Sequence, residues 1–386
     1  MSAPDSKRVY IVAGEASGDL LGAPLATELR KIHSDLQLRG VGGTHLQRAG
    51  MSLFRHHQEI TVMGLAEVLR RWQTLSRALK EIEQDIRDFR PDLLILVDFP
   101  GFNLTLARRL RATIPSIVYY ISPKFWAWRY NRVKKIARLT DLVACIFPFE
   151  PAHIERAGGH AVYEGHPLVD LVAADIDRET FFKEYHLKPE QKLVTFFPGS
   201  REQEVEQLLP PALEAVRELK KSHPQVQFAV HLASTQLAGH FTSVVSRAGL
   251  ITLSGNSHNA MTHSDYAAVA SGTANLETAL SGTPQLMYYR FHPFTWQLAR
   301  RVVKLDFASP VNIVLEREAI PELLQDSLTE RLIAEIDNYL RHPEESAENF
   351  THQYAELSEK LGEPGVIKRL AQEISSFLTR PAEVGK

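Results

Sequence analysis

The chain has little cysteine, and this scarcity excludes several classes of protein. Its 386 residues include one cysteine, so there is no disulfide framework and no cysteine cluster to hold a metal. Cys145 lies in the apolar segment 142–147, where a small buried hydrophobic residue is expected rather than a reactive thiol. A protein without disulfides suits the reducing cytoplasm, which is where we expect this one.

The chain also lacks a strong charge of one sign. It has 44 Lys and Arg against 46 Asp and Glu, a formal net charge of −2. A general nucleic-acid-binding protein would carry a strongly basic domain, so we expect no nucleic-acid partner. Any cationic function must instead be confined to a local patch.

Long hydrophobic runs are missing as well. A membrane-spanning helix needs about 18 or more consecutive apolar residues, and no such run occurs. The first apolar run, Val9–Ala13, is interrupted at once by Gly14 and Glu15, which is too short for a secretory signal. We therefore expect neither a transmembrane helix nor a signal peptide.

Several catalytic motifs are absent. The sequence contains no G-x-G-x-x-G fingerprint after its first strand, no P-loop, no G-x-S-x-G nucleophile turn and no H-E-x-x-H pair. Its 16 histidines form no ligand spacing, since His56 and His57 are adjacent rather than one helical turn apart. We therefore expect no metal and no cofactor.

What the chain does contain is an alternation of short apolar runs with helical patterns. This alternation is typical of α/β proteins whose parallel sheets are covered by helices. It predicts two Rossmann-like domains with a ligand cleft at the carboxyl ends of their strands, followed by a helical C-terminal segment. The expected strands are 9–13, 93–97, 117–121, 142–147 and 161–163 in the first half, and 193–197, 227–232, 250–253, 266–270 and 285–289 in the second.

At this length two cores of roughly 150 to 200 residues each are the normal expectation. The charged stretch 175–192 reads as a connector, so we predict a first domain at 1–175 and a second at 188–340. From Pro321 onward the pattern indicates polar helices. Residues 341–386 are expected to pack back on the first domain or to be exchanged in a dimer.

The segment Ser271–Glu277 follows an apolar run and opens a helical pattern. Gly272 would let a ligand approach the backbone, Ser271 and Thr273 offer hydroxyls, and the first N–H groups of a helix attract an anion. Glu277, one turn further on, can accept hydrogen bonds from ribose hydroxyls. Taken alone, such a segment is more often an ordinary capped helix.

A similar segment, Pro198–Arg201, follows the strand at 193–197. The N–H groups around Gly199 and Ser200 form a second predicted phosphate-binding site, after the one at Ser271–Glu277. The Arg201 guanidinium could bind a diphosphate there. The alternative is that Arg201 is merely solvated beside acidic neighbours. Two such segments in one domain favour a nucleotide.

In the first half, polar groups follow two predicted strands. The loop at 14–22 carries Glu15, Ser17 and Asp19, whose acids would repel a pyrophosphate but suit sugar hydroxyls. Asp98 ends the strand at 93–97, where burial could raise its pKa and make it a general base; the alternative is a turn aspartate.

Two surfaces are candidates for contact with lipid. Six cations and no acid lie between Lys124 and Arg138, which indicates an anion-attracting surface or simply a solvated basic helix. An apolar stripe with a cationic flank fits either core packing or a helix at a membrane interface. The stripe comprises Val62, Met63, Leu65, Val68, Leu69 and Trp72.

The combination of motifs resembles the lipid-A-disaccharide synthase family over the chain from its first strand to about Asn312. The motifs are Gly14–Asp19, Val62–Gly64 with Glu67–Leu69, Ser122–Pro123 with Trp126–Trp128, Pro198–Arg201 and Ser271–Glu277. Two positions depart from the family pattern. Gly101 stands where the family commonly has a second aspartate, and Lys124 stands where a different residue is usual.

The resemblance implies an inverting, metal-independent GT-B glycosyltransferase that acts peripherally at the cytoplasmic face of the inner membrane. It would join UDP-2,3-diacylglucosamine to 2,3-diacylglucosamine 1-phosphate (lipid X), forming the β-1′,6-linked disaccharide of lipid A and releasing UDP. Family members can be homodimers, which extends to this chain as an expectation.

The resemblance also implies roles for individual residues. Asp98 would take the proton from the 6-hydroxyl of the acceptor, and Arg201 would stabilise the departing UDP. Glu277 would hold the ribose, with Arg290 and Asn312 as further nucleotide contacts. The acceptor or transferred sugar would be met by Glu15, Ser17, Asp19, Asn103 and Trp126.

Two alternatives share parts of this pattern. Another UDP-N-acetylglucosamine enzyme of the same fold, an epimerase or a transferase, would keep the nucleotide seats but would not need the apolar stripe. A non-catalytic protein that binds lipid or nucleotide sugar could use the same scaffold.

Overall fold

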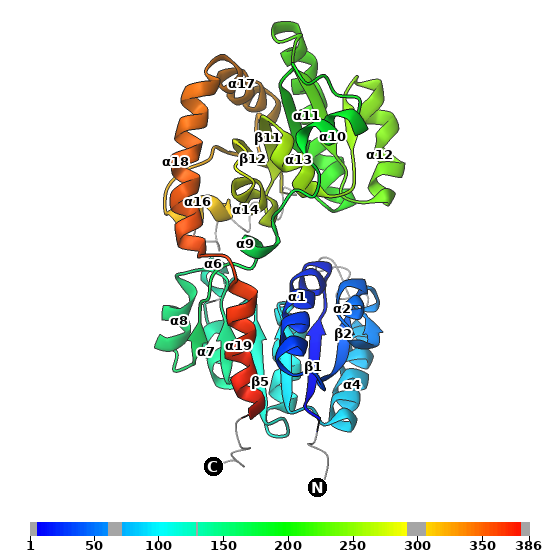
Figure 1. Ribbon diagram of the computed structural model, residues 1–386, viewed down its shortest axis with the longest axis vertical. Helices are drawn as coiled ribbons and strands as arrows, with labels where there is room; N and C mark the ends of the chain where they lie inside the picture. The colour runs from blue at the N-terminus through cyan, green and yellow to red at the C-terminus, as the bar shows by residue number, and fades with distance from the viewer. Residues whose placement is uncertain (1–5, 61–71, 129, 292–305, 380–386) are drawn as a thin grey trace. The chain divides into compact units, whose positions relative to one another are not determined.

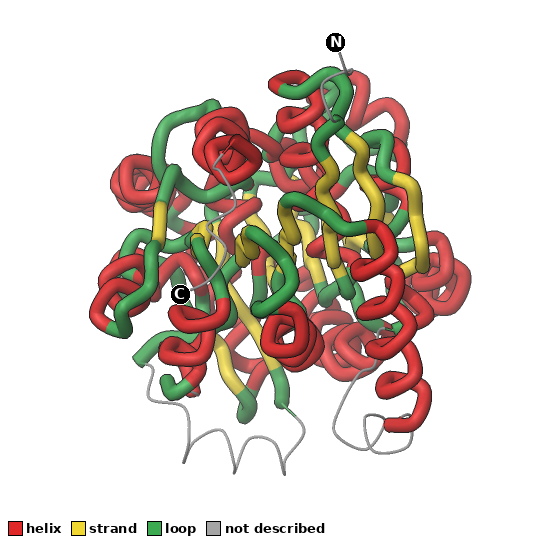
Figure 2. The backbone as a smooth tube through the Cα atoms, turned by 90° about the horizontal axis from the view of Figure 1, so that it is seen from below, coloured by secondary structure: helices red, strands yellow, loops and turns green. Residues whose placement is uncertain are grey.

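The computed structural model describes residues 6–60, 72–128, 130–291 and 306–379. The chain divides into two compact units, one formed by residues 1–170 together with 361–386 and the other by residues 171–360. Each unit contains one parallel sheet, and Figure 2 shows strands flanked by helices. The α/β fold with two Rossmann-like sheets is therefore confirmed.

The first unit is built on a seven-stranded sheet with the order β3-β2-β1-β4-β5-β6-β7. Strands β1, β4 and β5 are buried along nearly their whole length, because helices cover both faces of a parallel sheet and favour continuous apolar runs. The strands are β1 (Arg8–Ala13), β2 (Gln37–Gly42), β3 (Ser52–His56), β4 (Leu93–Val97), β5 (Ser116–Tyr120), β6 (Leu142–Ala144) and β7 (Ala161–Val162).

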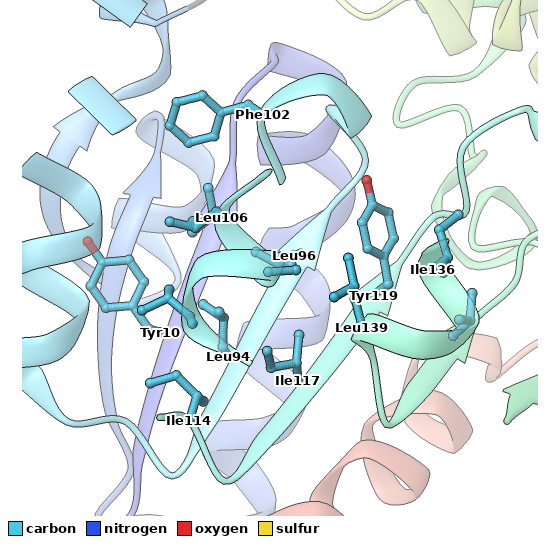
Figure 3. Close-up of a cluster of buried hydrophobic side chains, with 14 of the residues drawn as sticks. Tyr10, Leu94, Leu96, Phe102, Leu106, Ile114, Ile117, Tyr119, Ile136 and Leu139 are labelled. Atoms are coloured by element: carbon cyan, nitrogen blue, oxygen red, sulfur yellow. The ribbon is translucent and has the colours of Figure 1, made fainter. Parts of the chain in front are cut away.

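The helices of this unit cover both faces of its sheet. Figure 3 shows Leu94 and Leu96 of β4 with Ile117 and Tyr119 of β5 on the face that receives Leu106 and its neighbours. The helices are α1 (Ala16–Ile32), α2 (Thr44–Arg48), the 3-10 turn η1 (His57–Glu59), α4 (Trp72–Phe89), α5 (Pro100–Leu110), α6 (Phe125–Trp128), α7 (Arg132–Leu139), α8 (Glu150–Arg156), α9 (Leu168–Leu171, at the division between the units) and α19 (Val366–Thr379).

The last described helix, α19, returns to the first unit, where it packs beside α1 and over β5 (Figure 1). The Asp170 carboxylate fixes its start by accepting hydrogen bonds from the N–H groups of Gly365, at 2.6 Å, and Ile367, at 2.8 Å. A carboxylate at a helix N-terminus satisfies donors that have no partner within the helix.

The second unit contains a six-stranded parallel sheet with the order β10-β9-β8-β11-β12-β13. Its strands are β8 (Leu193–Phe197), β9 (Gln227–His231), β10 (Ile251–Leu253), β11 (Tyr266–Ala270), β12 (Gln285–Tyr289) and β13 (Glu322–Leu324). Its helices are α10 (Arg178–Glu184), α11 (Glu202–Ser222), α12 (Thr235–Arg247), α13 (Ser257–His263), α14 (Thr273–Leu280), α16 (Pro310–Leu315), α17 (Leu328–Arg341) and α18 (Pro343–Leu361).

The polar C-terminal region is helical, as expected, with one correction. Residues Glu322–Leu324 form β13, which pairs with β12 at the edge of the sheet, so the prediction of helix from Pro321 onward is wrong there. A three-residue edge strand carries too little apolar pattern to be distinguished from a turn. No helix in the described part of the chain is both long and apolar enough to cross a membrane.

Candidate functional site

The order of the first sheet reverses between β1 and β4, so the loops that follow these two strands diverge. The two strands pair in parallel with Ala13 opposite Val97. The loop that starts at Gly14 therefore begins beside Asp98. In open parallel sheets, ligands bind at the carboxyl ends of strands at such a reversal.

The backbone of Asp98 and Phe99 is held in an unusual conformation. Both residues adopt the left-handed region, with φ of 44° and 48°. The Asp98 carbonyl accepts hydrogen bonds from the Tyr119 hydroxyl, at 2.6 Å, and from the Asn103 amide, at 2.7 Å. Left-handed residues other than glycine carry strain that the surrounding structure must offset, and they concentrate at functional sites.

The side chain of Asp98 lies in an environment that favours its neutral form. Burial, followed by the nearby Glu15 carboxylate, raises the pKa of Asp98 to about 6, while Lys124 and the N–H group of Phe99 act in the opposite direction. A carboxylate with such a pKa can both accept a proton near neutral pH and remain largely ionised beforehand. The sequence prediction that burial raises this pKa is thus confirmed.

Two other polar residues in this region are engaged by the backbone. The buried Asp19 carboxylate accepts hydrogen bonds from the N–H groups of Gly43, His45 and Leu46 at 2.6 to 3.1 Å and so caps α2. The buried Asn103 amide donates to the carbonyls of Val12, Val97 and Asp98.

The loop at the start of α1 retains exposed groups. Glu15 precedes the helix and is half-buried, and Ser17 is exposed in its first turn. Ser17 does not cap the helix, since Glu15 occupies the N-cap position without a side-chain hydrogen bond. Glu15 and Ser17, rather than Asp19, are therefore the side chains of this loop that a substrate could reach.

Trp126 is held by a residue that sequence reasoning did not identify. Its indole Nε1 donates to Glu150 Oε1 at 3.0 Å, and the other Glu150 oxygen accepts from the N–H groups of Ile146 and Phe147. Glu150 is fully buried, and this burial raises its pKa despite these donors. Glu150 thus ties the loop after β5 to the loop after β6.

The strand order of the second sheet reverses between β8 and β11. The two predicted phosphate-binding loops follow these strands. Phe197 pairs with Val269, so Gly199 and Ser271 begin their loops at the same level of the same edge. The next strand, β12, ends at this edge with Tyr289. Burial, followed by the Glu204 carboxylate, raises the pKa of Tyr289, and the Arg201 cation opposes this rise only in part. Arg201, Glu204 and Tyr289 therefore lie within electrostatic range of one another.

The loop at Gly272 is open as far as the described residues are concerned. Gly272 has a φ of +143°, and no described heavy atom lies within 4 Å of the position that a side chain would take. Its N–H donates to Asn275 Oδ1 at 3.3 Å. The N–H groups of Thr273 and Ala274 begin α14 and have no acceptor within the helix.

Glu277 lies one turn into α14 and is largely buried, with 17% of its side chain exposed. Its Oε2 is 3.5 Å from Nε2 of His258 on α13. Sequence reasoning missed His258, because no local pattern connects it with Glu277. The pair leaves a carboxylate beside the open loop, where it could meet neutral hydroxyls.

The loop at Gly199 is filled by the protein itself. Glu204 Oε2 accepts hydrogen bonds from the N–H groups of Ser200, at 3.2 Å, and Arg201, at 3.3 Å, and its Oε1 lies 3.4 Å from the Arg201 guanidinium. Gly199 has a φ of +106°, and any side chain there would collide with Glu204. This is one half of a capping box: the glutamate three residues after the N-cap accepts from the N-cap N–H, whereas Arg201 has no side-chain acceptor for the reciprocal bond.

The two remaining predicted nucleotide contacts differ in availability. Arg290 is exposed just after β12, and its Nε donates to the carbonyl of Gln325 at 3.4 Å. Asn312 is buried; its oxygen accepts from the N–H groups of Ala319 and Ile320, and its amide donates to Ile320 and Glu322. Asn312 therefore shapes the loop before β13.

Predicted membrane contacts fall mostly outside the described residues. This holds for Val62, Met63, Leu65, Val68 and Leu69, and Trp72 is described only as the first residue of α4. Among the described residues, no group of three or more His, Cys, Asp or Glu side chains could hold a metal ion.

Comparison with known proteins decides between the alternatives. Residues 9–375 match the family described as lipid-A-disaccharide synthetase. A relative from Geobacter sulfurreducens, named lipid-A-disaccharide synthase, is 39% identical over 98% of this chain and 99% of its own length. One from Myxococcus xanthus with the same name is 37% identical over 96% of this chain and 97% of its own length. The chain belongs to the lipid-A-disaccharide synthase family.

Solved structures place the family's fold among the GT-B enzymes. The UDP-GlcNAc 2-epimerase of Neisseria meningitidis, solved with UDP-GlcNAc, matches with a TM-score of 0.67 over 96% of this chain and all of its own, at 12% identity. A glycosyltransferase of Rickettsia africae matches with a TM-score of 0.58 over 98% of this chain and all of its own, at 11% identity. At these identities the likeness concerns the fold, whereas family membership rests on the close relatives.

Proposed function

We propose that the chain transfers a diacylated glucosamine from UDP-2,3-diacylglucosamine to the 6-hydroxyl of 2,3-diacylglucosamine 1-phosphate. The products are the β-1′,6-linked disaccharide of lipid A and UDP. The observation that carries the proposal is the 39% identity to a lipid-A-disaccharide synthase across 98% of the chain. Its family is one of glycosyltransferases of lipid A synthesis.

In this proposal the acceptor binds at the edge of the first sheet, beside Asp98. The Asp98 carboxylate takes the proton of the 6-hydroxyl while that oxygen forms a bond to the anomeric carbon of the donor. Burial raises the pKa of Asp98 and the nearby Glu15 carboxylate adds to this rise, so one carboxylate accepts the proton and the other increases its basicity.

The donor binds at the edge of the second sheet. Its diphosphate lies against the N–H groups of Thr273 and Ala274, which have no acceptor within α14, and its ribose meets Glu277. As the bond between the anomeric carbon and the diphosphate breaks, its electron pair leaves with UDP, and the Arg201 guanidinium stabilises the added charge. Attack from the side opposite UDP inverts the anomeric configuration.

Both substrates carry acyl chains, so we further propose that the protein collects them at the cytoplasmic face of the inner membrane. Support comes from α7, whose Lys134, Lys135 and Arg138 are exposed while Val133 and Ile136 are buried. Cations at a membrane surface attract anionic lipid.

Polar replacement of Leu65, Leu69 and Trp72 should release the protein from vesicles in a flotation assay, and unchanged flotation would contradict this attachment. The expected homodimer is tested by the mass of the protein in solution.

The transferase proposal is tested by incubating the purified protein with both diacylglucosamine substrates. Disaccharide mass and UDP should appear together in equal amounts, and Asp98→Ala should abolish both. Release of UDP without disaccharide would indicate hydrolysis of the donor instead, and conversion of the donor to an isomeric UDP-sugar without UDP release would indicate an epimerase. Binding without either product would favour a non-catalytic protein.

A further inference from the structure

The Gly199 loop has the outward features of a phosphate site but contains an internal anion. It follows β8, contains a glycine with positive φ and opens the 21-residue helix α11. Its N–H groups at Ser200 and Arg201 nevertheless point to the Glu204 carboxylate. A donor that already has a carboxylate partner offers little to a phosphate, since binding would first have to displace that partner.

We infer that Glu204 is the positioning residue of Arg201 and that the donor diphosphate does not replace it. One Glu204 carboxylate holds both the backbone N–H and the guanidinium of Arg201, which restricts the direction of a side chain that is otherwise 55% exposed. A long exposed cation retains rotamer freedom that it must lose to act on a transition state, and a fixed partner reduces that loss. The inference rests on the proposed role of Arg201 at the departing UDP.

The glycine of this loop supports the same inference. A side chain at residue 199 would collide with Oε2 and Cβ of Glu204, so the loop needs glycine in order to close around its own carboxylate. The space in front of Gly199 is therefore occupied by Glu204. If the donor diphosphate bound in this loop, the closely packed Glu204 carboxylate would have to move away each time the donor binds.

A double-mutant cycle tests whether Glu204 acts through Arg201. We expect Glu204→Ala to lower kcat by about 10- to 30-fold and to change KM for the UDP donor by less than about threefold. In an Arg201→Ala background the same change should alter kcat by less than about twofold, because coupled residues are not additive. Equal loss in both backgrounds would overturn the inference, whereas a normal rate for Arg201→Ala alone would overturn the proposed role of Arg201.

Two further variants keep the test independent of folding. Glu204→Gln retains an oxygen for the N–H groups and should recover at least about a third of kcat, while Glu206→Ala, at an exposed position of the same helix, should match the parent. UDP affinity is measured by calorimetry without any sugar acceptor. Tighter UDP binding by Glu204→Ala and Glu204→Gln, by more than about threefold, would show that Glu204 competes with the diphosphate and would contradict the inference.

Discussion

The loops after β8 and β11 begin at the same edge of one sheet, yet one is filled and the other is open. Glu204 occupies the space beside Gly199, whereas no described atom lies within 4 Å of a side-chain position at Gly272. Both loops contain a glycine with positive φ before a helix. A glycine with positive φ before a helix can therefore allow either close packing by the protein itself or the approach of a ligand.

The largest effect on turnover is expected from a change at Asp98, which lies outside both loops. This change should separate turnover from UDP binding. Asp98→Asn removes the proposed base and should lower kcat by about 10²- to 10⁴-fold, with UDP affinity unchanged. Because ionisation of Asp98 creates the base, and burial raises its pKa to about 6, the rate of the parent should fall as pH decreases through about 6. Initial rates between pH 5 and 8 measure this. Retention of the same acidic limb by Asp98→Asn would assign it to another group.

The open loop should be sensitive to any added side chain. Gly272→Ala places a methyl group where the diphosphate is proposed to lie and strains the backbone, so UDP affinity should fall by about 30-fold or more. Gly282→Ala is the matched control, because Gly282 also has a positive φ and open space but lies after the end of α14. Calorimetry with UDP compares them, and equal losses would show that strain alone is responsible.

Glu277, one turn into the helix that follows the open loop, should favour ligands that carry a ribose 2′-hydroxyl. If its carboxylate accepts a hydrogen bond from the ribose, Glu277→Gln should weaken UDP binding by about tenfold. The binding of 2′-deoxy-UDP should change much less, which makes the two ligands each other's control. The same loss for both ligands would show that Glu277 does not bind the ribose 2′-hydroxyl.

The filled loop should respond through stability rather than affinity. Gly199→Ala introduces a left-handed alanine that collides with Glu204, so the free energy of unfolding should fall by about 1 to 3 kcal/mol. UDP affinity should stay within about threefold of the parent at a temperature where the variant is folded. Denaturant unfolding and calorimetry measure the two quantities, and a large affinity loss without destabilisation would reverse the assignment of the loops.

The sheets were largely predictable because their central strands are buried on both faces. Continuous apolar runs identified β1, β4, β8 and β11, whose ends carry the candidate site. Strand β2 was missed because Arg39, Gly40 and Gly42 interrupt its apolar pattern, and β3 and β13 are edge strands that need fewer apolar residues.

The partners of the site residues were less predictable, because most of them depend on contacts between distant segments. Nothing near Trp126 in the sequence points to Glu150, and nothing near Asp98 shows that Asn103 turns its amide to the backbone. Glu204 is an exception. It stands three residues after the N-cap residue Arg201, where a glutamate can accept a hydrogen bond from the N-cap N–H, so this spacing was visible in the sequence.

A crystal structure of the protein with UDP would show directly which of the two loops binds the diphosphate. We expect the diphosphate oxygens to lie within hydrogen-bond distance of the N–H groups of Thr273 and Ala274. Glu204 should still hold the N–H groups of Ser200 and Arg201. A diphosphate bound to the Ser200 and Arg201 N–H groups, with the Glu204 carboxylate displaced, would contradict this expectation.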